Sequence, residues 1–86
     1  MASHEETLAA LHTASGRCHE IQGGIHAQTQ EVDGIVHQLL AALGNTEAGT
    51  ILHSQAAQAT DALGTAMGAV ARLKEGVDAT LQRFQD

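Results

Sequence analysis

The chain has 86 residues, with four Lys and Arg against ten Asp and Glu, and a formal net charge of −6. This acidic balance, with one Phe and no Trp or Tyr, argues against nucleic acid as a partner, because it supplies neither a basic groove nor aromatic platforms for bases. The single cysteine excludes an internal disulfide, and no apolar run approaches the ~18 to 20 residues of a membrane span. We expect one soluble domain over residues 1–86, in which Cys18 packs as a small apolar residue.

The first predicted element is a helix over about residues 4–43. Ser3 is suited to cap its start, and Glu6 follows three residues later in the register of a capping box. Residues of one stripe then recur at alternating steps of three and four, and all but Gln28 are apolar or Cys. The stripe consists of Leu11, Ala14, Cys18, Ile21, Ile25, Gln28, Val32, Ile35, Leu39 and Ala42.

The stretch LGNTEAGT, residues 43–50, predicts a reversal over residues 44–46. Gly44 suits a helix C-cap, Asn45 or Thr46 suits the next N-cap, and Glu47 complements the dipole of the helix that follows. A second helix is predicted over about residues 47–84, because apolar residues again recur at alternating steps of three and four. A turn this short makes the two helices antiparallel neighbours. The stripe of the second helix consists of Leu52, Ala56, Ala59, Leu63, Ala66, Val70, Leu73, Val77, Thr80 and Phe84.

The apolar surface of each helix is wider than its stripe. Helix one adds Val36, Leu40 and Leu43, and helix two adds Ile51, Met67 and Leu81. An all-α hairpin cannot cover stripes this wide from both sides, so we expect a second chain, identical or different, to complete a four-helix bundle. The residues expected at this partner interface also have to supply packing within the hairpin; they are Ile21, Ile25, Val32, Ile35, Leu39, Leu63, Val70, Leu73, Val77 and Phe84.

Six histidines raise the question of a metal site. His12, His19 and His26 are seven residues apart, about 10.5 Å along a helix, which is too far for ligands of one ion. Only Asp33 and His37 have the required spacing of four, and two ligands do not make a structural zinc site. We therefore expect no metal and no cofactor. The three regularly spaced histidines form either a solvated face or a ladder that responds to pH near their ordinary pKa.

Catalytic residue types do not form a specific set. Ser15 and His19 stand four apart, a spacing that arises often by chance, and no pattern indicates a cleft around them. We expect a protein that is not an enzyme. Gln28 has two interpretations: it sets register or partner choice as a buried polar residue in a coiled coil does, or it is a solvated residue at a loose position.

The chain resembles a known family over nearly its whole length. The opening helix ETLAALHTASGRCHEIQGGIHAQTQEVDGIVHQL, the short glycine-bearing reversal and the Ala-rich AGTILHSQAAQATDAL are similar to the small Trp-x-Gly (WXG, ESAT-like) helical hairpins exported by type VII (ESX) secretion systems. At the place of the family's Trp-x-Gly, this chain has Ala42-Leu43-Gly44 or Gly44-Asn45-Thr46, which retains the glycine without the tryptophan. Phe84 stands near the tyrosine of the family's Tyr-x-x-x-Asp/Glu export signal, and the sequence stops at Asp86 before that motif is complete.

The resemblance implies a protein that is secreted without a signal peptide and acts through dimerisation. It would be the signal-less member of a pair, or a small companion of a larger secreted effector. Its partner would be another helical hairpin, in a homo- or heterodimer, or the helical N-terminal domain of such an effector. The residues also leave open an alternative, a cytoplasmic homodimeric helical adaptor or interaction module.

Overall fold

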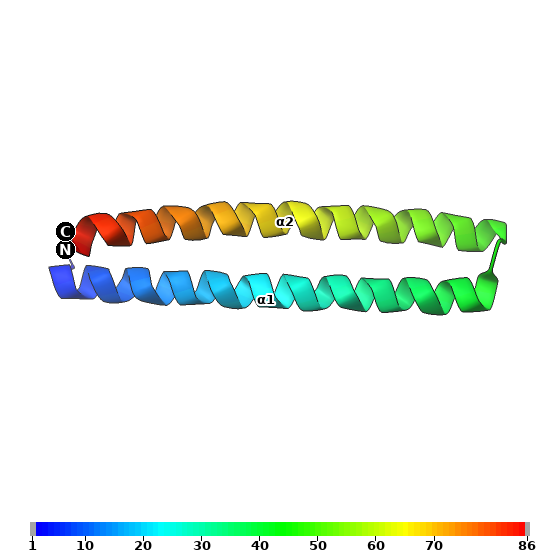
Figure 1. Cartoon of the computed structure of the whole chain (residues 1–86), viewed down its shortest axis with the longest axis horizontal. Helices are drawn as coiled ribbons and strands as arrows, with labels where there is room; N and C mark the ends of the chain where they lie inside the picture. Colours follow the sequence, from blue (N-terminus) through cyan, green and yellow to red (C-terminus); the bar gives the residue numbers. More distant parts are fainter. Residues whose placement is uncertain (1, 86) are drawn as a thin grey trace.

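A computed structural model describes residues 2–85; Met1 and Asp86 lie outside the described residues, so the end of the segment compared with the export signal is not described. Helix α1 spans His4–Leu43 and helix α2 spans Glu47–Gln85, one residue beyond the expected end. The helices run antiparallel along their whole length, with the two ends of the chain at one end and the turn at the other (Figure 1). The predicted all-α hairpin is confirmed.

Capping residues define where each helix begins and ends. The N–H of Glu6 donates to Ser3 Oγ at 3.1 Å, which satisfies one of the free donors at the start of α1. Thr46 caps α2, because its Oγ1 accepts from the N–H of Gly49 at 3.1 Å. Between them, Gly44 has φ 57° and donates its N–H to the carbonyl of Leu40 at 2.9 Å. Both predicted caps of the turn are therefore used, and Thr46 rather than Asn45 is the N-cap.

The turn also depends on Gly49, which is buried in the first turn of α2. A Cβ at this position would lie 2.8 Å from the carbonyl oxygen of Gly44 and 3.3 Å from the Cβ of Leu43. Contacts under about 3 Å are not tolerated between such atoms, so a side chain here would push the turn away from the helix. The glycine allows the chain to reverse within three residues.

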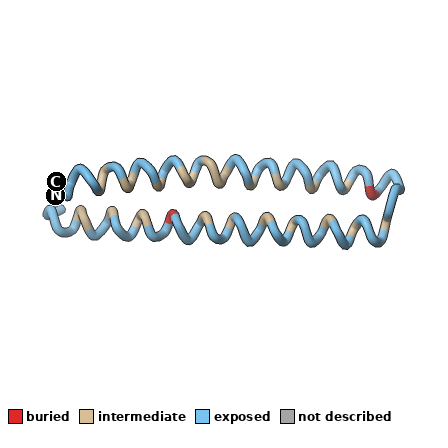
Figure 2. The backbone as a smooth tube through the Cα atoms, viewed as in Figure 1, coloured by how far each residue is buried: buried red, intermediate tan, exposed pale blue. Residues whose placement is uncertain are grey.

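The seam between the helices follows a heptad repeat, with residues at alternating steps of three and four on both helices. In Figure 2 these half-buried residues face each other along the whole hairpin. At heptad position d lie Leu11, Cys18, Ile25, Val32 and Leu39 of α1 with Ala56, Leu63, Val70 and Val77 of α2. At position a lie Leu8, Ser15, Gln22, Thr29, Val36 and Leu43 of α1 with Thr60, Met67, Lys74 and Leu81 of α2. His53 has the same position in the repeat but is exposed, and the neighbouring Leu52 is half-buried instead.

The two seam columns differ in character. Position d is wholly apolar, whereas position a includes the polar residues Ser15, Gln22, Thr29, Thr60 and Lys74. The stripe expected from the sequence contains the d positions of the seam. Its other members are g positions, each one residue before an a position, instead of the a positions themselves. A shift of one residue is a rotation of about 100° on a helix, so those residues lie at the edge of the seam or outside it: Ala14, Leu52, Ala66 and Thr80 are half-buried, and the others are exposed.

The hairpin has almost no interior. Cys18, 4% exposed, is the one buried apolar side chain among residues 2–85, in agreement with its expected packing role. The accessible surface is 6195 Å², whereas a compact protein of 8.9 kDa exposes roughly 4,800 Å². An elongated shape of 61 × 20 × 15 Å accounts for this excess, and it leaves a two-helix layer that is open on both broad sides.

The backbone at Gly44 gives a first prediction. Replacement of Gly44 by Ala forces a Cβ into a positive-φ conformation, which should lower the free energy of unfolding by about 1–3 kcal/mol. Gly34→Ala is the matched control, because a Cβ there meets no atom within 4 Å in the middle of α1. That change should raise stability by about 0.5–1 kcal/mol. Urea unfolding followed by circular dichroism measures both, and equal effects of the same sign would contradict this account of the turn.

Candidate protein–protein interface

The hairpin has two chemically distinct sides, which follow from the order of heptad positions around a helix. Position e lies next to a, and position g lies about 60° from d, on the opposite side of the seam. The structure shows that the a and e positions of both helices share one side. Asp33 and Val36 of α1 line the same open hollow as Ala57 and Thr60 of α2. The d and g positions of both helices therefore share the other side.

The d/g side carries an exposed apolar surface. We call its two g columns the apolar face; they are Ala14, Ile21, Gln28, Ile35 and Ala42 of α1 with Leu52, Ala59, Ala66, Leu73 and Thr80 of α2. Three of its four large apolar residues are exposed, at 48% for Ile21, 51% for Ile35 and 58% for Leu73, and the fourth, Leu52, is half-buried. Scattered exposed apolar residues are normal on proteins, but a seven-residue repeat on both helices of one side makes this face the candidate interface.

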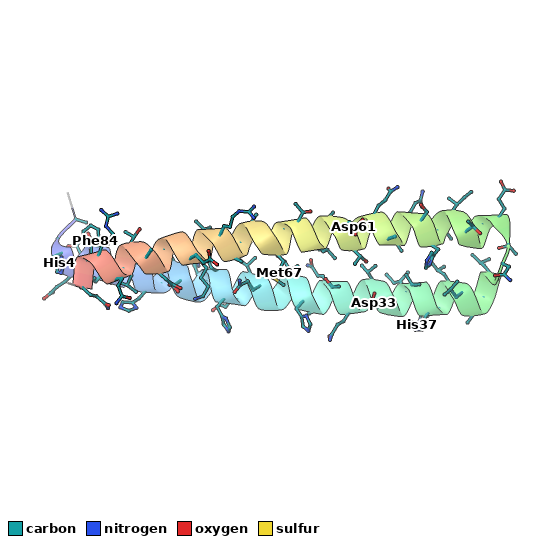
Figure 3. All side chains as sticks on the ribbon, turned by 45° about the horizontal axis from the view of Figure 1, so that its top comes forward. His4, Asp33, His37, Asp61, Met67 and Phe84 are labelled. Carbon is teal, nitrogen blue, oxygen red and sulfur yellow. The ribbon has the colours of Figure 1, made fainter. Side chains whose placement is uncertain are left out.

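The structure divides the residues expected at the partner interface. Six of them, Ile25, Val32, Leu39, Leu63, Val70 and Val77, are half-buried at position d and pack within the hairpin. Ile21, Ile35 and Leu73 lie on the apolar face. Phe84 lies at the open end of the hairpin, where its ring is 6.2 Å from that of His4 (Figure 3).

Sequence reasoning missed the a column as half of the seam. In the sequence, four of its apolar members appeared only among the six residues that widen the stripes. Of those six, Val36, Leu43, Met67 and Leu81 are half-buried in the seam, whereas Leu40 and Ile51 lie outside it and are exposed. The polar members gave no signal, because hydroxyl and amide residues at heptad spacing look like solvated positions. Contacts across the seam were needed to identify them.

The opposite side, the polar face, is formed by the a and e columns and holds a three-residue polar cluster. Ser15 Oγ donates to Asp78 Oδ1 at 2.6 Å, and Lys74 Nζ donates to Asp78 Oδ2 at 2.8 Å. The Ser15 contact joins α1 to α2 and fixes their relative register on this side. The hydrogen bonds from Lys74 and then Ser15 hold the pKa of Asp78 below its ordinary value, which weakens this carboxylate as a base. The cluster is therefore suited to holding the helices together rather than to proton transfer.

The histidine ladder also lies on the polar face. His12, His19 and His26 occupy position e and are exposed, so they do not border a partner bound at the apolar face. His37 donates its Nδ1 proton to the backbone carbonyl of Asp33 at 2.8 Å, so its contact is with the main chain of Asp33. Among residues 2–85 no group of three or more His, Cys, Asp or Glu is placed to hold a metal.

No family model, no curated protein and no solved structure matches this chain. Neither α1 nor α2, within the described part of the chain, combines the length and the apolar content needed to cross a membrane. The apolar face is thus the feature from which function has to be derived.

The polar cluster predicts a pH-dependent contribution to stability. Because folding lowers the pKa of Asp78, its stabilising effect is complete above the ordinary value of 3.8 and is lost as the pH falls through the lower folded value. Asp78→Asn should therefore reduce the urea midpoint of unfolding at neutral pH. The difference from the unchanged chain should vanish well below pH 3.8.

Asp61→Asn is the control for this measurement. Asp61 is an exposed carboxylate on the same side, and no hydrogen bond or ion pair is found for it within residues 2–85. Its replacement should leave the urea midpoint at neutral pH nearly unchanged. A loss equal to that of Asp78→Asn would mean that net charge, not the contact between helices, explains the effect.

Proposed function

We propose that this protein is a non-enzymatic helical partner that acts by binding a second helical chain through its apolar face, and that it serves type VII secretion as a WXG-like substrate or co-secreted partner. Binding closes the two-helix layer into a four-helix bundle. The partner is another helical hairpin or the helical N-terminal domain of a larger secreted effector.

The observation that carries this proposal is the continuity between the apolar face and the d columns. Measured around each helix, the g column lies about 90° from the centre of the a/d seam. In a four-helix bundle of square cross-section, the two neighbours of a helix also lie about 90° apart. A second pair of helices placed on the g columns would therefore enclose Ile25, Val32 and their d-column neighbours in the bundle centre, and would leave the a column, which mixes polar and apolar residues, at its outside.

The hairpin outline supports the assignment to secretion. Two helices of 40 and 39 residues joined by a three-residue turn agree with what the resemblance to the WXG family implies for its fold. The acidic composition and the glycine of the turn agree with it as well. Export by a type VII system would account for these features together with the apolar face that has no partner within the hairpin.

Binding through the apolar face is tested by a matched pair of substitutions. Ile35→Glu places a charge on the apolar face at a residue that is 51% exposed, and Leu40→Glu places the same charge on the polar face at a residue that is 46% exposed. Both variants should fold as the unchanged chain does, by circular dichroism. Ile35→Glu should weaken association with the helical partner at least about 30-fold, equivalent to about 2 kcal/mol, and Leu40→Glu should leave it unchanged.

Export is tested in a host bacterium that carries a type VII system. The chain should reach the culture supernatant, should remain in the cells when the ATPase of that system is deleted, and should be retained in the Ile35→Glu variant but not in Leu40→Glu. Retention of the unchanged chain irrespective of the ATPase would instead favour the alternative, an intracellular helical adaptor.

A further inference from the structure

The g column of α1 reads the same in both directions. From the amino end it is Ala14, Ile21, Gln28, Ile35 and Ala42, so each residue has an equivalent at the same distance from Gln28. We propose that the occupant of the apolar face is a second copy of this chain, packed face to face with its turn at the opposite end, with the two-fold axis at Gln28. This inference rests on the proposed function, because it uses the same face and names its partner.

A two-fold axis brings identical surfaces together, so a face that binds its own copy has to be self-complementary about one point. With the axis at Gln28, Ile21 of one chain lies against Ile35 of the second copy, and Ala14 lies against Ala42. Large residues meet large residues in the middle of α1, and small ones meet at its ends. The contact between the two α1 helices is therefore filled evenly along its length.

The same axis crosses α2, and the register of the hairpin gives the level at which it does. The hydrogen bond between Ser15 and Asp78 and the close approach of Leu43 to Gly49 fix which levels of α1 and α2 lie side by side. Counted from these contacts, the level of Gln28 falls between Gly64 and Thr65 of α2. About that level Leu73 lies near Ala56 of the second copy and Ala59 lies near Val70, so large side chains oppose smaller ones.

Gln28 decides between the two ways of placing the copy. With the turns at opposite ends, its amide lies against the amide of Gln28 of the second copy, and the two can donate and accept mutually. With the turns at the same end, each amide would lie between Leu63 and Ala66 of the other copy, and a polar group would be buried without a partner, which is unfavourable. This is the register-setting role that a buried polar residue has in coiled coils.

The size of the face is sufficient for a stable dimer. Its long and intermediate extents are 61 and 20 Å, which correspond to a contact of roughly 1,200 Å² for each chain. Stable complexes need about 800 Å² from each partner. The charged residues do not oppose this contact, because neither g column contains Asp, Glu, Lys or Arg.

Disulfide cross-linking of the full-length chain tests the axis. In the Gln28→Cys variant the introduced thiol lies at the two-fold axis, opposite its own equivalent, so mild oxidation should convert most of the protein to a covalent dimer. The unchanged chain is the control, because its Cys18 is buried and should give no covalent dimer. Sedimentation of the unchanged chain at micromolar concentration should show a dimer.

A second pair of variants tests the direction. Ile21→Cys and Ile35→Cys should not form covalent dimers separately, because equivalent positions are about 21 Å apart along the axis when the copies are antiparallel. Mixed in equal amounts, the two variants should form a covalent heterodimer. Circular dichroism verifies that each variant is helical before oxidation.

The outcomes separate this inference from the proposed function. A monomeric unchanged chain, or a Gln28→Cys variant that forms no covalent dimer although it is helical and dimeric, would overturn the inference. If the chain is monomeric alone yet Ile35→Glu still abolishes ATPase-dependent export, the function stands with a different partner. If the predicted cross-links form but the chain is never exported, the homodimer stands and the secretion role is wrong.

Discussion

The placement of the d column is the constraint on which the structure depends. It is the only fully apolar column in the seam, and it lies on the side of the seam next to the partly exposed g columns. Two helices alone cover it from one direction only. The resulting molecule has a folded backbone and complete caps, but its one apolar core is open along a whole side.

This geometry ties the stability of the fold to its association. Seven glycines in addition to Gly44 and Gly49 lie within the helices, where each disfavours the helix relative to Ala, and Cys18 alone is buried among the apolar side chains of residues 2–85. A chain with so little interior gains most of its remaining apolar burial when a partner covers the d and g columns. Its apparent stability should therefore rise with partner concentration, as it does for obligate dimers.

The sequence predicted the elements and their caps, because these depend on local chemistry at Ser3, Gly44 and Thr46. It also identified the stripe that combines columns d and g. What it did not determine is which two of the three neighbouring columns a, d and g form the seam within the hairpin. The contact between helices that accompanies that choice, Ser15 with Asp78, joins residues 63 positions apart, so local patterns do not reveal it. In the structure Ile21 and Ile35 are exposed, whereas Met67 and Leu81 are half-buried in the seam.

The polarity of the a and e columns limits what the apolar face can assemble. A two-helix layer that was apolar on both sides could bind further copies without limit, because each added copy would present another exposed apolar face. Here the exposed His12, His19 and His26 and the Ser15–Asp78–Lys74 cluster interrupt the apolar residues of the second side, such as the 46%-exposed Leu40, so that this side has no continuous apolar column on α1. One face can therefore be covered once, and the assembly closes after two layers. The polar residues in the seam weaken the hairpin as an isolated unit, but they restrict it to a single mode of association.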